Sequence, residues 1–465
     1  MLLFAWLTLA EADASAYYFA DVGVRAFGRG GAFIAGADDI NAQYYNPAAL
    51  SRIKGGRFTL NVAAVDQYVY FDRADEVSGD TTEVFDPVLN VAKPYVIPNF
   101  GVSWDAGREG TTFAFGFYPP YAPDVSYDPN GPQRYTLVDT SVIQTNLGPS
   151  VGHRFVEWAP WLSVGAGVSW ALMYAEQELV LTTSGNDDPA GDIRFSLAAT
   201  DRARFTGNAG ILIEPESGRF AIGASVTPPV KFWAEGAMTG DFTTHGLYTG
   251  GFVTDPIVQD DAISLAITMP LILRAGVLVR PIDGLEVELA GVWQDWRIVE
   301  TIVVDDVEMN LHTQAGDIVI EGPIELPAGY EDAFSVRLGA EYDVNDQLAL
   351  RAGGMFESSA IPAATQGVGL VDGPKWGYSA GATYRVGRRY ALDAGFAQQL
   401  IAPRVITNSQ VRQVQIDATS GEVDEGRIVG NGLFKSRVTM FGVGLSVDFD
   451  LQDAAPAAAG AAAGG

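Results

Sequence analysis

The sequence has no cysteine and few cationic residues, and both shortages exclude classes of function. Without cysteine, the 465-residue chain has no disulfide framework, no thiol nucleophile and no cysteine-based metal site. Lys and Arg together number 29 against 57 Asp and Glu, which gives a formal net charge of -28. Such a chain is repelled by the phosphates of nucleic acids and lacks the basic clusters of a membrane-surface protein.

Histidine is also rare, with three in the chain: His153, His245 and His312. They are scattered between turns and loops, so they form neither a metal-binding spacing nor a Ser-His-Asp arrangement. Gly28-x-Gly30 superficially resembles a dinucleotide loop, but Phe33 stands at the place of the third glycine and no strand precedes it. We therefore expect no metal, no cofactor and no catalytic residue, and a protein that is not an enzyme.

Long apolar runs are missing as well, because no run reaches the roughly 18–20 residues of a membrane-spanning helix. The nearest, residues 1–10, is typical of a secretory signal peptide, and Ala14-Ser15-Ala16 provides a cleavage site of the A-x-A type. No Lys or Arg precedes this run, so an ordinary N-terminal segment is the alternative and the true start of translation stays open. We expect a signal peptide over residues 1–16.

Alternation of apolar residues with small or polar ones dominates the rest of the chain. The segments 162–170, 334–342 and 441–449 each place every second residue on one apolar face of a strand. The apolar face would meet a core in a soluble β-sandwich and lipid in a membrane barrel. The period of two alone does not separate these folds.

The lengths of the connections separate them. We expect about 14 strands, an even number, as in single-chain bacterial barrels. Their expected ranges are 57–66, 97–106, 111–119, 134–156, 160–175, 201–214, 218–228, 262–280, 284–296, 330–343, 347–356, 376–386, 389–398 and 433–449. Short and long connections strictly alternate, as they do where tight periplasmic turns oppose long external loops. The sequence thus predicts an all-β fold, a transmembrane antiparallel β-barrel over residues 57–449 with both termini periplasmic. The Ala/Gly-rich residues 450–465 are expected to be a disordered tail.

Residues 23–50 differ from the strands because they are rich in Gly and Ala. They contain Gly28-Arg29-Gly30-Gly31-Ala32-Phe33, then Ala37-Asp38-Asp39, then Tyr45-Asn46-Pro47-Ala48. This stretch resembles the N-terminal plug of the FadL/OmpP1/TodX family of outer-membrane transporters for hydrophobic compounds. Residues 331–354 and 430–434 also look like the corresponding family segments, in the same order.

The resemblance implies a plug, or hatch, over residues 17–56 inside the lumen of a Gram-negative outer-membrane barrel. Family barrels capture a hydrophobic ligand among external loops, pass it to an apolar pocket, and release it sideways into the bilayer after the hatch moves. Lateral release is physically reasonable, because apolar surface in a water-filled pore costs roughly 25 cal/mol per Å². The expected ligands are long-chain fatty acids or aromatic hydrocarbons, and the expected state is a monomer. Which ligand is carried and which residues line the pocket stay open.

The resemblance assigns two groups of residues to this mechanism. The hatch group consists of Gly28, Gly30, Gly31, Asn46, Pro47 and Ala48. A plain Asn-Pro turn is the alternative for its last three members. The second group, Gly116, Pro119 and Pro120, would open a gap in the barrel wall at the third strand. The prolines are expected at the outer end of that strand, where an ordinary loop start is the alternative, and Gly116 is the better-placed candidate for a kink.

Four arginines share the strand face with small residues and should point inward: Arg274, Arg337, Arg351 and Arg385. They could hold the carboxylate of a fatty acid. Pairing with lumen acids such as Glu286, Glu288 or Glu341 is the favoured interpretation.

Two other functions compete with uptake of hydrophobic compounds. A general diffusion porin is the first, but an open pore has no need of a Gly/Ala-rich N-terminal segment. A structural or adhesive barrel is the second, in which the long acidic loops bind partners.

Overall fold

The computed structural model describes residues 21–78, 81–184, 187–417 and 423–449. The expected signal peptide and the expected C-terminal tail lie outside the described residues. None of the helices within the described ranges is long and apolar enough to cross a membrane.

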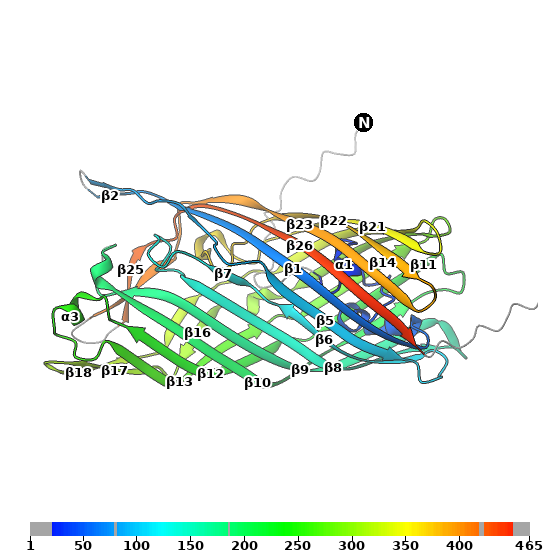
Figure 1. Cartoon of the computed structure of the whole chain (residues 1–465), viewed down its shortest axis with the longest axis horizontal. Coiled ribbons are helices and arrows are strands. Elements are labelled where there is room, and N and C mark those ends of the chain that lie inside the picture. Colours follow the sequence, from blue (N-terminus) through cyan, green and yellow to red (C-terminus); the bar gives the residue numbers. More distant parts are fainter. Residues whose placement is uncertain (1–20, 79–80, 185–186, 418–422, 450–465) are drawn as a thin grey trace, which may run out of the picture.

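The chain folds into an antiparallel β-barrel of 14 strands, which confirms the predicted fold class. Figure 1 shows the strands inclined to the long axis of the barrel. The barrel closes where β1 pairs with β26, from Gly56 opposite Phe449 to Arg73 opposite Gly432. The wall consists of β1 (Gly56–Arg73), β5 (Tyr95–Trp104), β6 (Thr111–Tyr121), β8 (Asp139–Phe155), β9 (Ala159–Thr182), β10 (Asp192–Ile213), β11 (Phe220–Thr227) continued by β12 (Val230–Asp241), β13 (Ile257–Met269) continued by β14 (Ile272–Val279), β15 (Leu285–Gln294), β20 (Ala333–Asp343), β21 (Leu348–Glu357), β22 (Lys375–Val386), β23 (Tyr390–Ile406) and β26 (Gly432–Phe449).

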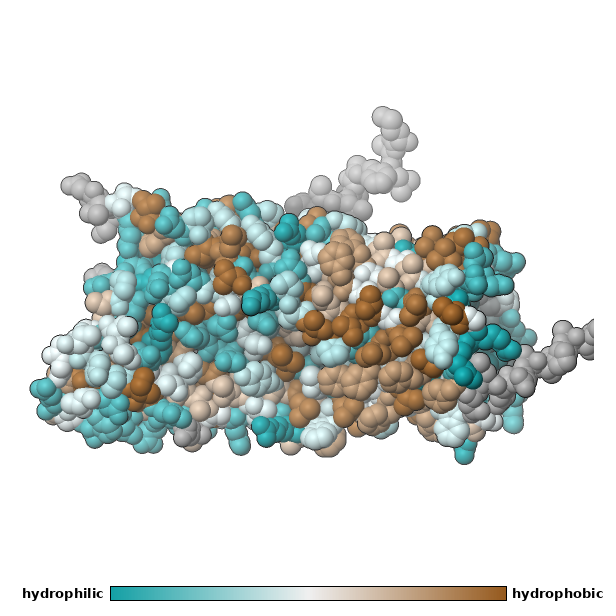
Figure 2. All heavy atoms as spheres, viewed as in Figure 1, coloured by the Kyte–Doolittle hydropathy of each residue, from teal (hydrophilic) through white to brown (hydrophobic). Residues whose placement is uncertain are grey.

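The two faces of the wall follow the alternation of the sequence. Leu338, Leu392 and Phe441 point outward and are 53%, 50% and 58% exposed, whereas Gly442 and Ser446 on the other face are buried. In Figure 2 the apolar residues are densest on the right half of the barrel, and hydrophilic residues predominate on the left half. Such an extended apolar surface is unfavourable in water, so this band is the part of the barrel that faces lipid.

Several strands are longer than the sequence suggests. Much of the expected loops 67–96, 176–200 and 229–261 is paired: β9 and β10, for example, stay in register as far as Thr182 opposite Asp192. Beyond the apolar band the pattern is inverted: Ile193, Phe195 and Leu197 of β10 face inward and are buried, whereas the outer face becomes polar. The apolar outer face on which the expected strands are based therefore ends there, although the backbones still need partners. Prolines interrupt the wall between β11 and β12 and between β13 and β14.

The remaining elements lie in the long connections. Figure 1 shows β2, α3, β17, β18 and β25 at the end of the barrel away from the plug. These elements are β2 (Glu76–Ser78), β3 (Thr81–Glu83), β4 (Val88–Leu89), β7 (Asp124–Ser126), η2 (Pro189–Gly191), α3 (Gly246–Thr249), η3 (Trp296–Ile298), β16 (Thr301–Asp305), β17 (Glu308–Thr313), β18 (Gly316–Glu321), β19 (Ile324–Pro327), η4 (Ala363–Thr365), β24 (Arg412–Ile416) and β25 (Val423–Ile428). The other end has short connections, such as residues 156–158 and 387–389, where the sequence predicts them.

The N-terminal segment is packed inside the barrel, as predicted. It forms α1 (Val24–Phe27), α2 (Ala42–Tyr45) and the 3-10 helix η1 (Pro47–Arg52), and nearly all of its residues are buried. Small side chains allow its irregular backbone to lie close to the inner wall. We call residues 21–55 the plug.

Candidate functional site

Asn46 ties the plug to the barrel wall. Its side chain is fully buried, and its Nδ2 donates to the carbonyl oxygens of Ile34 in the plug (3.1 Å) and Ile211 in β10 (3.0 Å). Its Oδ1 accepts from the amide of Ala48 at 3.2 Å, which caps η1, and Pro47 occupies the first position of that helix. The Asn-Pro-Ala sequence is therefore a turn that also connects two parts of the molecule.

This turn packs against a row of glycines on the inner wall. Gly152, Gly165 and Gly210 are paired neighbours on β8, β9 and β10. A Cβ atom at Gly165 would overlap the backbone of Pro47, and one at Gly210 would overlap Oδ1 of Asn46. The small face of these strands is thus a docking surface for the plug.

The predicted Gly28, Gly30 and Gly31 lie at the end of α1 and also approach the wall closely. Gly30 and Gly31 have φ angles of +63° and +74°, which residues with a Cβ rarely adopt. A Cβ at Gly30 would lie 2.8 Å from the amide nitrogen of Gly354 in β21, and one at Gly28 would lie 3.3 Å from Cα of Gly381 in β22. These glycines allow direct contact between plug backbone and wall backbone.

Glu288 of β15 is a second anchor of the plug. Its fully buried carboxylate accepts hydrogen bonds from three successive plug amides, those of Ile34 (2.7 Å), Ala35 (2.8 Å) and Gly36 (2.9 Å). Glu288 is predicted from the sequence as a lumen acid, but not as an anchor of the plug. An acid on the small face of an alternating strand is the one indication that the sequence offers.

Ion pairs surround these contacts. Arg25 of the plug lies 2.7 Å from Asp38 and 3.3 Å from Glu341 of β20, and Arg29 lies 3.5 Å from Glu341. Asp39, in the plug and outside the strands, is also buried, and this burial raises its pKa to about 6. The plug is held by charge as well as by shape.

The four arginines predicted to face the lumen have different partners in the structure. Arg351 pairs with Glu341 at 2.6 Å, and Arg337 pairs with Asp21 of the plug and with Glu357 at 3.3 Å. The guanidinium of Arg274 lies 4.6 Å from the ring centre of Tyr44 and donates to Thr227 at 3.0 Å.

Arg385, in contrast, lies apart from the plug. It pairs with Asp343 at 3.0 Å, and its side chain is 36% exposed. Both residues lie near the short connections at the plug end of the barrel, so the structure does not bring Arg385 together with the other three arginines.

The wall is incomplete between β5 and β6. Their pairing begins at Trp104 opposite Phe113 and stops at Phe100 opposite Phe117, although β5 continues to Tyr95 along β1. Asn99 Nδ2 donates to the carbonyl oxygen of Phe117 at 3.1 Å and caps the end of this ladder. We call the unpaired stretch, Tyr95–Asn99 facing Tyr118–Tyr121, the wall gap.

The prolines, rather than Gly116, mark the irregularity. Gly116 is regularly paired on both sides, with Gly101 and Gly148, so the expected kink is not there. The register with β8 shifts between Tyr118 and Tyr121, and both intervening prolines are buried. They lie at the outer end of β6, as the sequence predicts, because the strand ends at Tyr121 and a proline has no amide hydrogen to donate to the ladder.

Three cavities lie inside the barrel, one among the loops and two beside the prolines of β6. A cavity of about 200 Å³ lies among the loops, with Val142, Leu197, Leu265 and Ile267 in its lining. A second one of about 30 Å³ is bounded by Tyr44, Pro120, Tyr121 and Arg274. A third one of about 20 Å³ lies between the plug and the wall gap, and its lining includes Asp21, Ile97, Asn99 and Pro119.

Comparison of the sequence with models of protein families identifies the family of the chain. The model of the family described as "Outer membrane protein transport protein (OMPP1/FadL/TodX)" matches residues 4–448. The chain belongs to the OMPP1/FadL/TodX family. This family consists of outer-membrane transport channels for hydrophobic compounds and not of enzymes, as the sequence predicts.

Curated relatives within the family match over short stretches only. The Long-chain fatty acid transport protein of Salmonella typhi is 30% identical over 88 residues, which is 19% of each chain. The 47 kDa outer membrane protein of Pasteurella multocida is 37% identical over 68 residues, which is 15% of this chain and 16% of the relative. The matched stretches thus span less than a fifth of these relatives.

Solved structures of the OMPP1/FadL/TodX family match over the whole fold. A FadL homologue from Pseudomonas aeruginosa superposes with a TM-score of 0.72 at 18% identity, covering 94% of this chain and all of that one. The toluene transporter TodX of Pseudomonas putida gives a TM-score of 0.61 at 16% identity, covering 95% of this chain and 100% of TodX. At these identities the likeness concerns the fold alone.

Proposed function

We propose that the protein takes up hydrophobic small molecules, either long-chain fatty acids or aromatic hydrocarbons, and releases them sideways into the bilayer. The observation that carries this proposal is a lumen occupied by the plug beside a wall ladder that stops at Phe100 and Phe117. The direct route through the barrel is filled by the plug, whereas a side route is bounded by the part of β5 and β6 that lies beyond the end of their ladder.

The orientation is part of the proposal. Short connections lie at the plug end of the barrel and long ones at the other, which is the arrangement of periplasmic turns and external loops. Residue 56 pairs with residue 449 at the plug end, so both termini of the barrel would lie in the periplasm of a Gram-negative bacterium.

Capture would occur in the cavity among the loops. The lining side chains Val142, Leu197, Leu265 and Ile267 come from four wall strands and offer apolar surface to a ligand. Removing the ligand's apolar surface from water stabilises binding by roughly 25 cal/mol per Å². Membership of the OMPP1/FadL/TodX family supports hydrophobic ligands here, and proteins of similar fold include the CymD monoaromatic hydrocarbon channel and the toluene transporter TodX.

The two smaller cavities suggest the route onward. They lie on the two sides of the Pro119-Pro120 pair: Pro120 bounds the one that contains Arg274, and Pro119 bounds the one at the wall gap. Tyr44 and Asp21 of the plug line these cavities, so a ligand passes only when the plug shifts. Arg274 lines the route, and its guanidinium is placed to meet a carboxylate head group.

The hatch group would control this shift. Asn46, Pro47 and Ala48 dock on the wall glycines, Gly28 and Gly30 dock on β22 and β21, and Gly31 lies beside the guanidinium of Arg337 on β20. Close packing of backbone against backbone has few intermediate positions, so we propose that the plug moves between one closed and one open arrangement.

A general diffusion porin is the alternative, and deletion of residues 21–55 tests both. On our proposal the wild-type protein conducts ions poorly in a planar bilayer, and the deletion variant shows large single-channel currents. Cells with wild-type protein take up labelled oleate or toluene, and cells with equal surface amounts of an unrelated closed barrel are the control. Large currents from the wild type, or uptake equal to the control, would contradict the proposal.

The plug-deletion variant also tests the alternative of an adhesive barrel, and the purified protein tests the oligomeric state. Adhesion would depend on the long loops and be independent of the plug, so the deletion would leave it unchanged. Light scattering of the purified protein in detergent tests the proposed monomer.

A further inference from the structure

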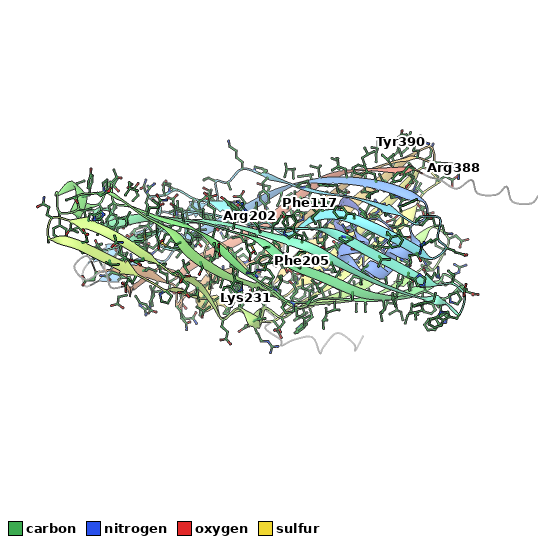
Figure 3. The ribbon with its side chains drawn as sticks, turned by 90° about the horizontal axis from the view of Figure 1, so that it is seen from below. Phe117, Arg202, Phe205, Lys231, Arg388 and Tyr390 are labelled. Atoms are coloured by element: carbon green, nitrogen blue, oxygen red, sulfur yellow. The ribbon has the colours of Figure 1, made fainter. Side chains whose placement is uncertain are left out.

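A cluster of aromatic and cationic side chains lies on the outer face of the wall, about midway along the barrel. It consists of Trp170 on β9, Arg202 and Phe205 on β10, and Lys231 and Trp233 on β12, and we call it the Arg202 cluster. Figure 3 shows Phe205 on the side of the plug, and Arg202 and Lys231 somewhat farther from the plug end. Arg388 and Tyr390 lie at the opposite margin, near the plug end of the barrel.

The Arg202 cluster contains two contacting pairs, and its members stay open to the surroundings. Trp170 Nε1 donates to the carbonyl oxygen of Arg202 at 2.6 Å, and the ammonium of Lys231 lies 3.9 Å from the ring centre of Trp233. Phe205 is 72% exposed, and Trp170 and Trp233 are 45% and 48% exposed. The ring of Trp233 thus places the ammonium of Lys231 without using its hydrogen-bond donors, whereas Trp170 contacts the backbone of Arg202.

These cations carry a local positive charge in a strongly acidic protein. The neighbouring Arg204 pairs with the buried Asp201 at 2.6 Å and is neutralised. Arg202 and Lys231 are exposed, and among the described residues neither has a carboxylate within 4.0 Å.

The distance of the cluster from the plug end of the barrel indicates which layer of the membrane surrounds it. Arg202 precedes the end of β10, Ile213, by 11 residues, and Lys231 follows the start of β11, Phe220, by 11 residues. With a rise of about 3.3 Å per residue and a tilt of about 40°, that is roughly 28 Å along the barrel axis. The apolar band of outer-membrane barrels is about 25 Å tall. Both cations therefore lie just beyond the lipid tails, at the level of the head groups.

A second, separate pair of strands repeats the arrangement. On β26 the outward-facing Arg437 lies 4.9 Å from the ring of Tyr68, and Lys435 lies 4.8 Å from the ring of Tyr70. The two tyrosines stand directly opposite these cations on β1. Arg437 precedes the end of β26, Phe449, by 12 residues, which is the same height within one residue.

We propose that the Arg202 cluster binds a phosphate group of an outer-leaflet glycolipid. The two cations face the negative charge, the aromatic rings lie against the upper part of the acyl chains, and the Lys435–Arg437 pair forms a second contact of the same kind. This inference rests on the proposed orientation, because the plug end must face the periplasm for the cluster to reach the outer leaflet.

The test measures binding of bis-phosphorylated lipid A to the full-length protein in detergent by native mass spectrometry. The double variant Arg202→Gln with Lys231→Gln should bind it about 10- to 30-fold more weakly than wild type, since each cation near an anionic surface contributes up to about a fivefold factor. Binding of dephosphorylated lipid A should not change. Arg388→Gln, an exposed arginine at the other margin, is the matched control and should bind as wild type.

Each other outcome overturns part of the account. Equal binding by wild type and the double variant would remove the site. Displacement of the lipid by millimolar inorganic phosphate would show a free-anion site instead of a lipid site. If Arg388→Gln alone weakened lipid binding, the orientation of the barrel would be the reverse of the proposed one. The proposed uptake of oleate or toluene is measured separately and would not be contradicted by that result. Folding is checked by the heat-dependent gel mobility of the barrel, and the two single variants replace the double variant if it does not fold.

Discussion

Replacement of Glu288 by Gln should loosen the plug without unfolding the barrel. In the wild-type protein one carboxylate accepts from the amides of Ile34, Ala35 and Gly36 at 2.7–2.9 Å. The Gln side chain keeps a single acceptor oxygen, and its own amide group must face at least one of these N–H donors. The variant thus loses a charged acceptor and leaves a buried donor without a partner.

The size of the effect follows from these contacts. A hydrogen bond to a charged group contributes about 1.5–3 kcal/mol, and an unsatisfied buried donor costs about 1–3 kcal/mol. These two values partly describe the same lost contact and are not simply added. We therefore expect the docked state of the plug to be destabilised by about 2–3 kcal/mol in total. A loss of this size raises the population of undocked plug by about 30- to 150-fold.

Hydrogen–deuterium exchange read by mass spectrometry measures this change directly. Peptides that cover residues 34–36 should exchange faster in the variant by that factor, whereas wall peptides such as those from β9 keep their rates. Glu286→Gln is the matched control: it lies on the same strand, is 28% exposed, and contacts Arg280 and Arg29. That variant should change exchange by less than a factor of about five, since partly exposed ion pairs contribute about 0–1 kcal/mol. Equal exchange of residues 34–36 in wild type and Glu288→Gln would refute the anchor.

Three further predictions concern the wall, the hatch and pH. Leu392→Arg, which places a charge on the lipid-facing surface, should cost about 2–4 kcal/mol in the free energy of unfolding into urea, whereas Ser446→Arg faces the lumen and should displace the plug instead. The double variant Asn46→Ala with Pro47→Ala should leave the barrel folded but lower uptake of labelled oleate or toluene at matched surface amounts, and unchanged uptake would reduce these residues to a plain turn. The pKa of Asp39 is raised to about 6 by burial, so the docked plug binds a proton more tightly than the free segment and becomes more stable as the pH falls from about 7 to 5. Plug amide exchange, corrected for its intrinsic pH dependence, should slow over this range in wild type and not in Asp39→Asn.

The sequence is sufficient to predict the architecture because the environment imposes a simple rule on it. Lipid outside and a narrow lumen inside require apolar residues to alternate with small ones, and segments such as 334–342 show this directly. Beyond the membrane the outer face meets water and becomes polar, whereas inner-face residues such as Phe195 and Leu197 are apolar and buried, so the pattern expected for a lipid-facing strand is lost. For this reason the sequence predicts loops where β1, β9 and β10 in fact extend.

The site is less predictable because it depends on contacts between distant residues. Resemblance locates the Asn46-Pro47-Ala48 turn, but its partners Ile34 and Ile211 come from the folded plug and from β10. The role of Glu288 depends on where the plug backbone passes, and no local pattern encodes that path. Gly116 has the composition of a kink, yet it serves as space for the plug side chain of Gln43.

The proposed exit through the wall gap can be tested most directly by closing it. The chain has no cysteine of its own, so cysteines placed at Ile97 on β5 and Pro119 on β6 are the sole thiols, and both positions line the cavity at the gap. A thiol-reactive cross-linker that joins them should abolish uptake of labelled oleate or toluene, and a cleavable version should restore it on reduction. Cross-linking Val102→Cys to Phe115→Cys, a pair in the intact part of the same ladder, should leave uptake unchanged. Full uptake with the gap cross-linked would contradict lateral release.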